Sequence, residues 1–123
     1  MKNLKTYLFL FLFVLLITDT NALPRFALKL GDKEIICSYF GAGHTTDNIV
    51  VYIPSERILF AGCMCKELDS KGLGNIADAD LNEWPKTIQK VLDRYQDAKI
   101  VIPGHGQAGD IELLKHTLDL LNN

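Results

Sequence analysis

The chain has 123 residues, of which 48% are hydrophobic and 23% are charged. This composition excludes an intrinsically disordered protein, because a disordered chain has too few apolar residues to build a core. The formal net charge is −2, which gives no basis for a nucleic-acid partner or an acidic partner. The sequence therefore predicts a globular protein.

The first 22 residues have the pattern of a secretory signal peptide. Lys2 and Lys5 form a positive region, an unbroken apolar run follows over residues 7–17, and small residues lead up to Ala22. A membrane anchor is the alternative, but a spanning helix needs about 20 apolar residues, and this run is shorter. We therefore expect cleavage after Ala22, export to a bacterial periplasm, and a mature chain over residues 23–123.

The chain has three cysteines, and export would place them in an oxidising compartment. With an odd number, one cysteine stays unpaired, pairs between chains or binds a metal. If Cys63 binds a metal, Cys37 and Cys65 remain as a possible disulfide pair. The alternative, which we favour, is that both are small buried hydrophobic residues on strands.

Four short strands are predicted in the first half of the mature chain, over residues 26–30, 34–40, 48–53 and 58–64. Gly31 and Asp32 form a turn signal, so the first two strands read as a hairpin. The third and fourth strands are apolar almost throughout. Such strands suggest a sheet that is covered on both faces.

The second half alternates helix, strand and helix. Residues 67–81 read as a loop or a short helix, and a clear helix follows with Asn82 as its N-cap and Pro85 in its first turn. The apolar positions of this helix fall on one face: Trp84, Ile88, Val91, Leu92 and Tyr95. A strand over 99–102 and a last helix, from its cap at Asp110 to Leu121, complete an α/β layer with helices on at least one face of the sheet.

Three segments place a metal-binding residue type beside small or turn-forming residues. His44 follows Gly-Ala-Gly, Cys63 follows Ala-Gly at the end of a strand, and His105 lies in Pro-Gly-His-Gly. Imidazole and thiolate are strong zinc ligands. The alternative to a metal ligand at His44, taken singly, is a surface loop histidine. The alternative at Cys63 is a buried structural cysteine.

The motifs Gly-His-Thr-x-Asp-Asn, Cys-x-x-Lys, Leu-Gly-Asn, Asn-Glu-Trp and Pro-Gly-His-Gly follow one another in this chain. In this order they closely resemble the C-terminal half of the class B metallo-β-lactamases, in the subclass with a cysteine zinc ligand. The resemblance runs from about Phe26 to the end. It implies the C-terminal half of an αβ/βα sandwich, with a mixed sheet and helices on one face.

The resemblance also implies roles for single residues. His44 would complete a three-histidine zinc site, and Cys63 and His105 would hold a second zinc ion. Lys66 would pair with the carboxylate of a β-lactam, although a solvated surface lysine is the alternative. Asn75 would donate to the lactam carbonyl oxygen, although a turn asparagine beside Gly74 fits the sequence equally well.

Family members also carry a His-x-His-x-Asp motif, which this sequence lacks. In the family, two zinc ions and a metal-bound hydroxide open the lactam amide of β-lactam antibiotics. We therefore expect a truncated β-lactamase that is inactive or weakly active alone. The alternatives are a hydrolase that becomes active with another chain, and a non-enzymatic secreted zinc- or partner-binding module.

Overall fold

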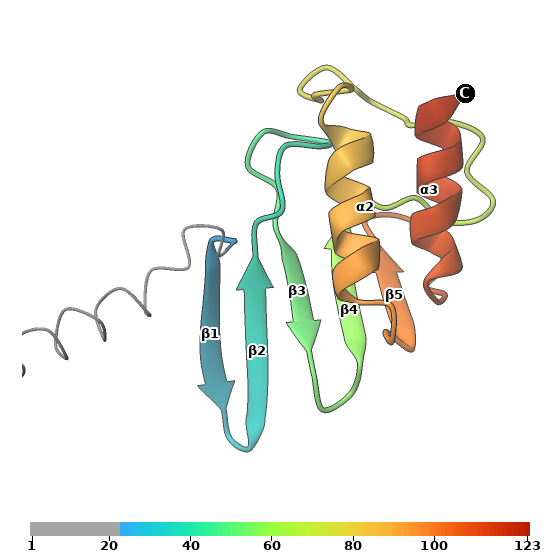
Figure 1. The fold of residues 1–123 in the computed structure, drawn as a ribbon. Coiled ribbons are helices and arrows are strands. Elements are labelled where there is room, and N and C mark those ends of the chain that lie inside the picture. The colour runs from blue at the N-terminus through green and yellow to red at the C-terminus, as the bar shows by residue number, and fades with distance from the viewer. Residues whose placement is uncertain (1–22) are drawn as a thin grey trace, which may run out of the picture.

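The computed structural model describes residues 23–123, so the predicted signal peptide and its cleavage site lie outside the described residues. The described part contains five strands and two helices (Figure 1). Their bounds are β1 Arg25–Leu30, β2 Lys33–Ser38, β3 Val50–Ile53, β4 Ile58–Gly62, α2 Trp84–Arg94, β5 Ile100–Pro103 and α3 Glu112–Asn122. Neither helix is long and apolar enough to cross a membrane.

The five strands form one sheet in the order β1-β2-β3-β4-β5. The first four strands are antiparallel neighbours, whereas β5 lies parallel to β4. The parallel pair requires a crossover, which contains α2. The expected mixed sheet is therefore confirmed.

Both helices cover the same face of the sheet, as Figure 1 shows. The core lies between this face and the helices, and Trp84, Leu59 and Leu114 are among its largest fully buried side chains. Alternate residues of β3 and β4 point into it, so that Val50 and Leu59 are fully buried. Helices on one face of the sheet were expected and are confirmed.

The second face of the sheet has no cover from residues 23–123. The strand registers place one row of five residues across this face: Phe26, Cys37, Val51, Phe60 and Ile102. Phe26 is 63% exposed and Phe60 is 42% exposed. The apolar sequence of the strands suggested a sheet that is covered on both faces, and within the described residues that prediction is wrong.

Several element ends differ from the prediction. The fourth strand stops at Gly62, short of Met64, because Gly62 has a φ of 60° and turns the chain. Asn82 is not the N-cap of α2. The carboxylate of Asp80 instead accepts hydrogen bonds from the backbone amides of Asn82 and Glu83, at 3.1 and 3.0 Å, and the helix begins at Trp84. Residues 67–81 form a loop without a helix.

All three cysteines are free. Cys37 is half-buried on β2, where a strand residue was expected. Cys65 is buried, as expected, but it lies in the turn after β4 and not on a strand. The possible disulfide between Cys37 and Cys65 is not formed.

Candidate metal centre

The predicted site residues lie on loops that meet at one edge of the sheet. The directions of the strand pairs make β2, β4 and β5 run the same way, so their carboxyl ends point to the same edge (Figure 1). The loops over 41–48, 63–67 and 104–108 follow these three strands. Each loop carries one predicted metal ligand.

Cys63 and His105 are brought together by this arrangement. The Sγ atom of Cys63 lies 3.5 Å from the Nε2 atom of His105. The two loops touch at their bases, where a β-carbon added to Gly104 would lie 2.5 Å from the backbone nitrogen of Cys63. The glycine before His105 is therefore required for the close approach.

His44 lies on the loop over 41–48, which is held by its own side chains. Asn48 accepts a hydrogen bond from the backbone amide of Thr45 at 3.1 Å and donates one to the carbonyl of Gly41 at 3.0 Å. Asp47 accepts a hydrogen bond from the Thr45 hydroxyl at 2.9 Å. These three residues shape the turn that carries His44.

The surroundings of His44 favour a neutral imidazole. Its Nδ1 atom is buried and has no hydrogen-bond partner among the described residues. Burial lowers the pKa of His44 below 6.5, and the charge of Lys66 lowers it further against an opposing effect of Asp78. His105 also lies near enough to lower this pKa. A neutral imidazole is the form that binds a metal.

Lys66 extends over the ring of Trp84, with its Nζ atom 5.4 Å from the ring centroid. Burial lowers the pKa of this ammonium, and the nearby Cys63 and Cys65 oppose the shift. The same indole packs against His44, with ring centroids 5.4 Å apart. Trp84 is thus a shared, fully buried support beneath two predicted site residues.

Two hydrogen bonds fix the loop that carries Cys63 and Lys66. The indole N–H of Trp84 donates to the carbonyl of Met64 at 2.9 Å. The hydroxyl of Thr117, on α3, accepts a hydrogen bond from the backbone amide of Lys66 at 2.8 Å. The sequence had placed Trp84 on the apolar face of a helix, but nothing in its pattern indicated the contribution of Thr117.

Asn75 is exposed, and its Oδ1 atom accepts a hydrogen bond from the backbone amide of Ala77 at 3.0 Å. This bond is the turn role that the sequence left open. Its Nδ2 group makes no hydrogen bond within residues 23–123. The neighbouring Gly74 adjoins Lys66, since a β-carbon there would lie 4.0 Å from Nζ.

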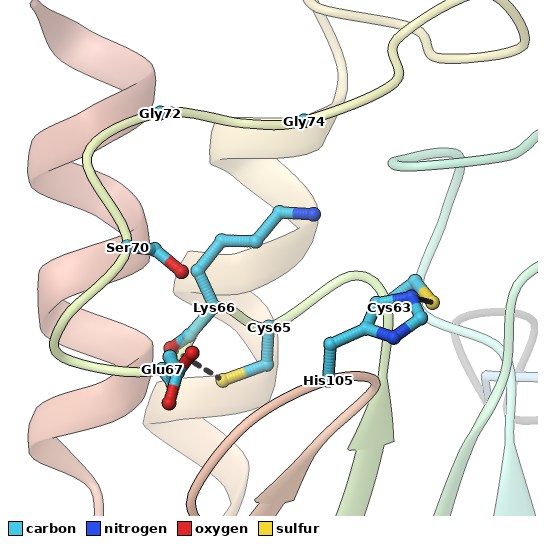
Figure 2. Close-up of a pocket in the computed structure, with 8 residues that line it drawn as sticks. All are labelled: Cys63, Cys65, Lys66, Glu67, Ser70, Gly72, Gly74 and His105. Carbon is cyan, nitrogen blue, oxygen red and sulfur yellow. Dashed lines mark hydrogen bonds between the residues drawn. The ribbon is translucent and has the colours of Figure 1, made fainter.

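A pocket of about 150 Å³ lies between these loops. In Figure 2, His105 and Cys63 lie side by side, and Lys66 extends toward the segment that carries Gly74. The lining residues are Cys63, Cys65, Lys66, Glu67, Ser70, Gly72, Gly74 and His105. Sites for drug-sized ligands usually measure ~300–1,000 Å³, so this pocket encloses only part of such a ligand.

The donor set fits part of a zinc site. A thiol sulfur and an imidazole nitrogen at 3.5 Å are close enough to bind one ion, and zinc accepts both donor types. Within residues 23–123, however, no group of three or more histidine, cysteine or acidic side chains could hold a metal ion. Cys63 and His105 therefore form a pair of ligands, and His44 is not part of that pair.

Comparison with known proteins agrees with this fold. The chain is 51% identical over 95 residues to a metallo-β-lactamase type 2 of Bacteroides fragilis, and 53% identical over 94 residues to one of Bacillus cereus. These matches cover 77% and 76% of this chain. They cover 38% and 37% of the relatives, so the chain spans less than two fifths of their length. No protein-family model matches.

Among solved structures, a metallo-β-lactamase from Pontibacter korlensis matches with a TM-score of 0.79 and 44% identity. The match covers 89% of this chain and 54% of that structure. The mixed sheet with helices on one face thus matches part of the metallo-β-lactamase fold. Over the matched segment, the chain belongs to the metallo-β-lactamase family.

Proposed function

We propose that this chain forms the part of a zinc β-lactamase site that holds metal and contacts substrate, in the hydrolysis of the lactam amide of β-lactam antibiotics. The observation that carries the proposal is the 3.5 Å approach of Cys63 Sγ to His105 Nε2, in a pocket that Lys66 also lines. The names of the relatives support the substrate class.

In this proposal Cys63 and His105 hold one zinc ion, and His44 contributes a ligand to another. When it is bound, zinc supplies Lewis acidity and activates water near neutral pH. Burial lowers the pKa of His44, which favours the neutral imidazole, and this imidazole and the soft sulfur of Cys63 suit the ion.

The substrate contacts come from Lys66 and Asn75. The Lys66 ammonium, held over the Trp84 ring, binds the substrate carboxylate as a point charge. The unengaged Nδ2 group of Asn75 donates a hydrogen bond to the lactam carbonyl oxygen, where negative charge develops during attack. Asn75 follows Gly74 in the chain, and the Lys66 ammonium lies near Gly74, which supports their action on the same substrate.

We also propose that this chain is exported to the periplasm and is inactive or weakly active by itself. Export follows from the charged and apolar pattern of residues 1–22. The weak activity follows from the ligand count. The sequence has three histidines and no His-x-His-x-Asp motif, whereas catalytic zinc sites usually have three protein ligands.

A second candidate is a secreted, non-enzymatic zinc- or partner-binding module. The observation that favours it is the two-residue ligand pair, since no group of three metal-binding side chains occurs in the described part of the chain. In this case zinc would have a structural role, and bound zinc would raise the melting temperature.

A complementation assay separates the two candidates. The purified protein is loaded with zinc and tested for hydrolysis of a chromogenic cephalosporin, alone and after mixing with a polypeptide that supplies the His-x-His-x-Asp half of a metallo-β-lactamase. We expect little hydrolysis alone and clear hydrolysis in the mixture. Cys63→Ser should abolish it, whereas Cys37→Ser, at another half-buried cysteine, should not.

The zinc content of the protein decides the remaining outcomes. Stoichiometric zinc without hydrolysis in the mixture would favour the non-enzymatic module. A folded protein that binds no zinc and gives no hydrolysis in the mixture would exclude the β-lactamase site and the zinc-binding form of the module.

A further inference from the structure

The loop that carries His105 is closed at its base by the backbone. Val101 and Gly109 exchange two hydrogen bonds, with N···O distances of 2.8 and 3.0 Å. Residues 104–108 therefore form a short excursion between the end of β5 and this pair. The base alone does not fix the middle of the excursion, where His105 lies.

Glu67 contacts the middle of this excursion from the neighbouring loop. Its Oε2 atom accepts a hydrogen bond from the backbone amide of Gln107 at 2.8 Å. Its carboxylate also occupies the space that a β-carbon on Gly106 would fill, where the backbone has a φ of 81°. Within residues 23–123, no other side chain forms a hydrogen bond with the backbone of residues 104–108.

Glu67 and Cys63 belong to the same loop, over 63–67. Buried side chains anchor this loop, because Trp84 binds the carbonyl of Met64 and Thr117 binds the amide of Lys66. Glu67 extends from the anchored loop and lines the same pocket as Cys63 and His105 (Figure 2). The Glu67 carboxylate therefore links the middle of the His105 loop to the Cys63 loop, in addition to the backbone contact between Gly104 and Cys63 at the base of the loops.

We infer that Glu67 is a positioning residue, which holds the His105 loop at the distance from Cys63 that a shared metal ion needs. This inference rests on the proposed metal site. Contacts that orient metal ligands typically contribute about 10–100-fold to metal affinity. A hydrogen bond from a backbone amide to a side-chain oxygen is directional, which suits it to this task.

Two substitutions separate geometry from charge. Glu67→Ala removes the acceptor and the contact with Gly106. Glu67→Gln keeps an acceptor oxygen of the same reach but removes the negative charge. If positioning is the role of Glu67, the glutamine variant should behave like the parent and the alanine variant should not. Glu34→Ala, at an exposed glutamate on β2, is the matched control.

The first measurement uses the protein without metal. Hydrogen exchange of the Gln107 backbone amide should become about tenfold faster in Glu67→Ala, because the amide loses a hydrogen bond to a charged group. Exchange in Glu67→Gln and Glu34→Ala should match the parent. An unchanged rate in Glu67→Ala would overturn the inference, whatever the protein does with metal.

The second measurement uses Co²⁺ alone as the probe. Binding to Cys63 gives a thiolate-to-metal charge-transfer band, and we expect about tenfold weaker binding in Glu67→Ala, with little change in Glu67→Gln and Glu34→Ala. Equal losses in the alanine and glutamine variants would show that charge is what matters, and would overturn the positioning role. A parent protein without this band contradicts the proposed function, and the exchange measurement still decides whether Glu67 holds the loop.

Gly106→Ala provides an independent variant in case Glu67→Ala fails to fold. The β-carbon of the new alanine would take the space that the Glu67 carboxylate occupies, and so would displace the carboxylate. It should therefore reproduce both the faster exchange and the weaker Co²⁺ binding, and normal behaviour in a folded Gly106→Ala protein would count against the inference.

Discussion

Gly104 lies so close to Cys63 that no side chain fits between them. A β-carbon on Gly104 would lie 2.5 Å from the backbone nitrogen and 2.6 Å from the α-carbon of Cys63. The obstacle is backbone, which cannot rotate away as a side chain can. The two loops therefore meet through bare main chain, and the Cys63 and His105 side chains are aligned by that contact.

Gly104→Ala should force the two loops apart. Overpacking typically costs about 1–3 kcal/mol, and we expect the free energy of unfolding to fall by that amount in urea denaturation. Gly72→Ala is the control, because a β-carbon at Gly72 would meet nothing within 4 Å. Equal stabilities of the two variants would show that the close approach does not exist in solution.

Trp84→Phe should destabilise the loop beneath Lys66. The substitution removes the indole N–H that binds the Met64 carbonyl, and a buried acceptor that loses its partner costs about 1–3 kcal/mol. Thermal unfolding by circular dichroism measures this loss. Tyr39→Phe, which removes an exposed hydrogen bond to Thr46, should change stability by less than about 0.5 kcal/mol.

Thr117→Val should act on Lys66 from α3. Valine has nearly the same shape as threonine but cannot accept the hydrogen bond from the Lys66 amide, so we expect a loss of about 1–3 kcal/mol in the free energy of unfolding. Thr46→Val, at an exposed threonine, is the control. A Thr117→Val protein as stable as this control would show that the hydroxyl does not hold the loop.

The buried thiol of Cys65 predicts a loss of stability at alkaline pH. Burial raises the pKa of Cys65 from 9.0 to about 11. Between these values the unfolded chain loses the thiol proton while the folded chain keeps it, so stability falls as pH rises through this window. The full effect is about 3 kcal/mol, since each pKa unit corresponds to about 1.4 kcal/mol.

Urea unfolding at pH 8 and pH 11 checks this prediction. The parent should lose more stability between the two pH values than Cys65→Val, in which the ionising group is absent. All other ionisable groups are common to both proteins, so equal losses would show that Cys65 does not titrate as described.

The uncovered face of the sheet should promote self-association. Phe26 and Phe60 are exposed in one cross-strand row, and such apolar patches favour association. Phe26→Lys/Phe60→Lys should reduce concentration-dependent light scattering without lowering the melting temperature. Leu68→Lys, at a leucine that is 53% exposed and outside the sheet, should leave scattering unchanged if the sheet face is responsible.

The fold was predictable from the sequence where local periodicity is strong. Apolar residues at helical spacing predicted the helices, and apolar runs predicted the strands. Each of these elements begins and ends within a few residues of its predicted bounds. The ends were less predictable, because they depend on single interactions. The Asp80 carboxylate accepts the hydrogen bonds at the start of α2, where Asn82 was expected to do so. Both residues are polar and lie two positions apart, so the periodicity of apolar residues does not distinguish between them.

The site was predictable for residues with metal-binding chemistry and not for the residues that hold them. The approach of Cys63 to His105 follows from two strands that end at one edge. The hydrogen bond between Thr117 and Lys66 joins residues 51 positions apart. Similarly, the bond from Gln107 to Glu67 spans 40 positions. Side-chain contacts over such separations have no local pattern and appear only once the chain is folded.

The dependence of the Cys63 loop on Thr117 has a consequence for the order of events during synthesis. Thr117 lies 51 positions after Lys66 in the chain, so it leaves the ribosome well after the loop that it fixes. Cys63 and Lys66 emerge long before the hydroxyl that fixes their loop, and closing so long a segment has an entropic cost. The ligand loop can therefore reach its final geometry only after Thr117 has been synthesised and α3 has packed against the loop.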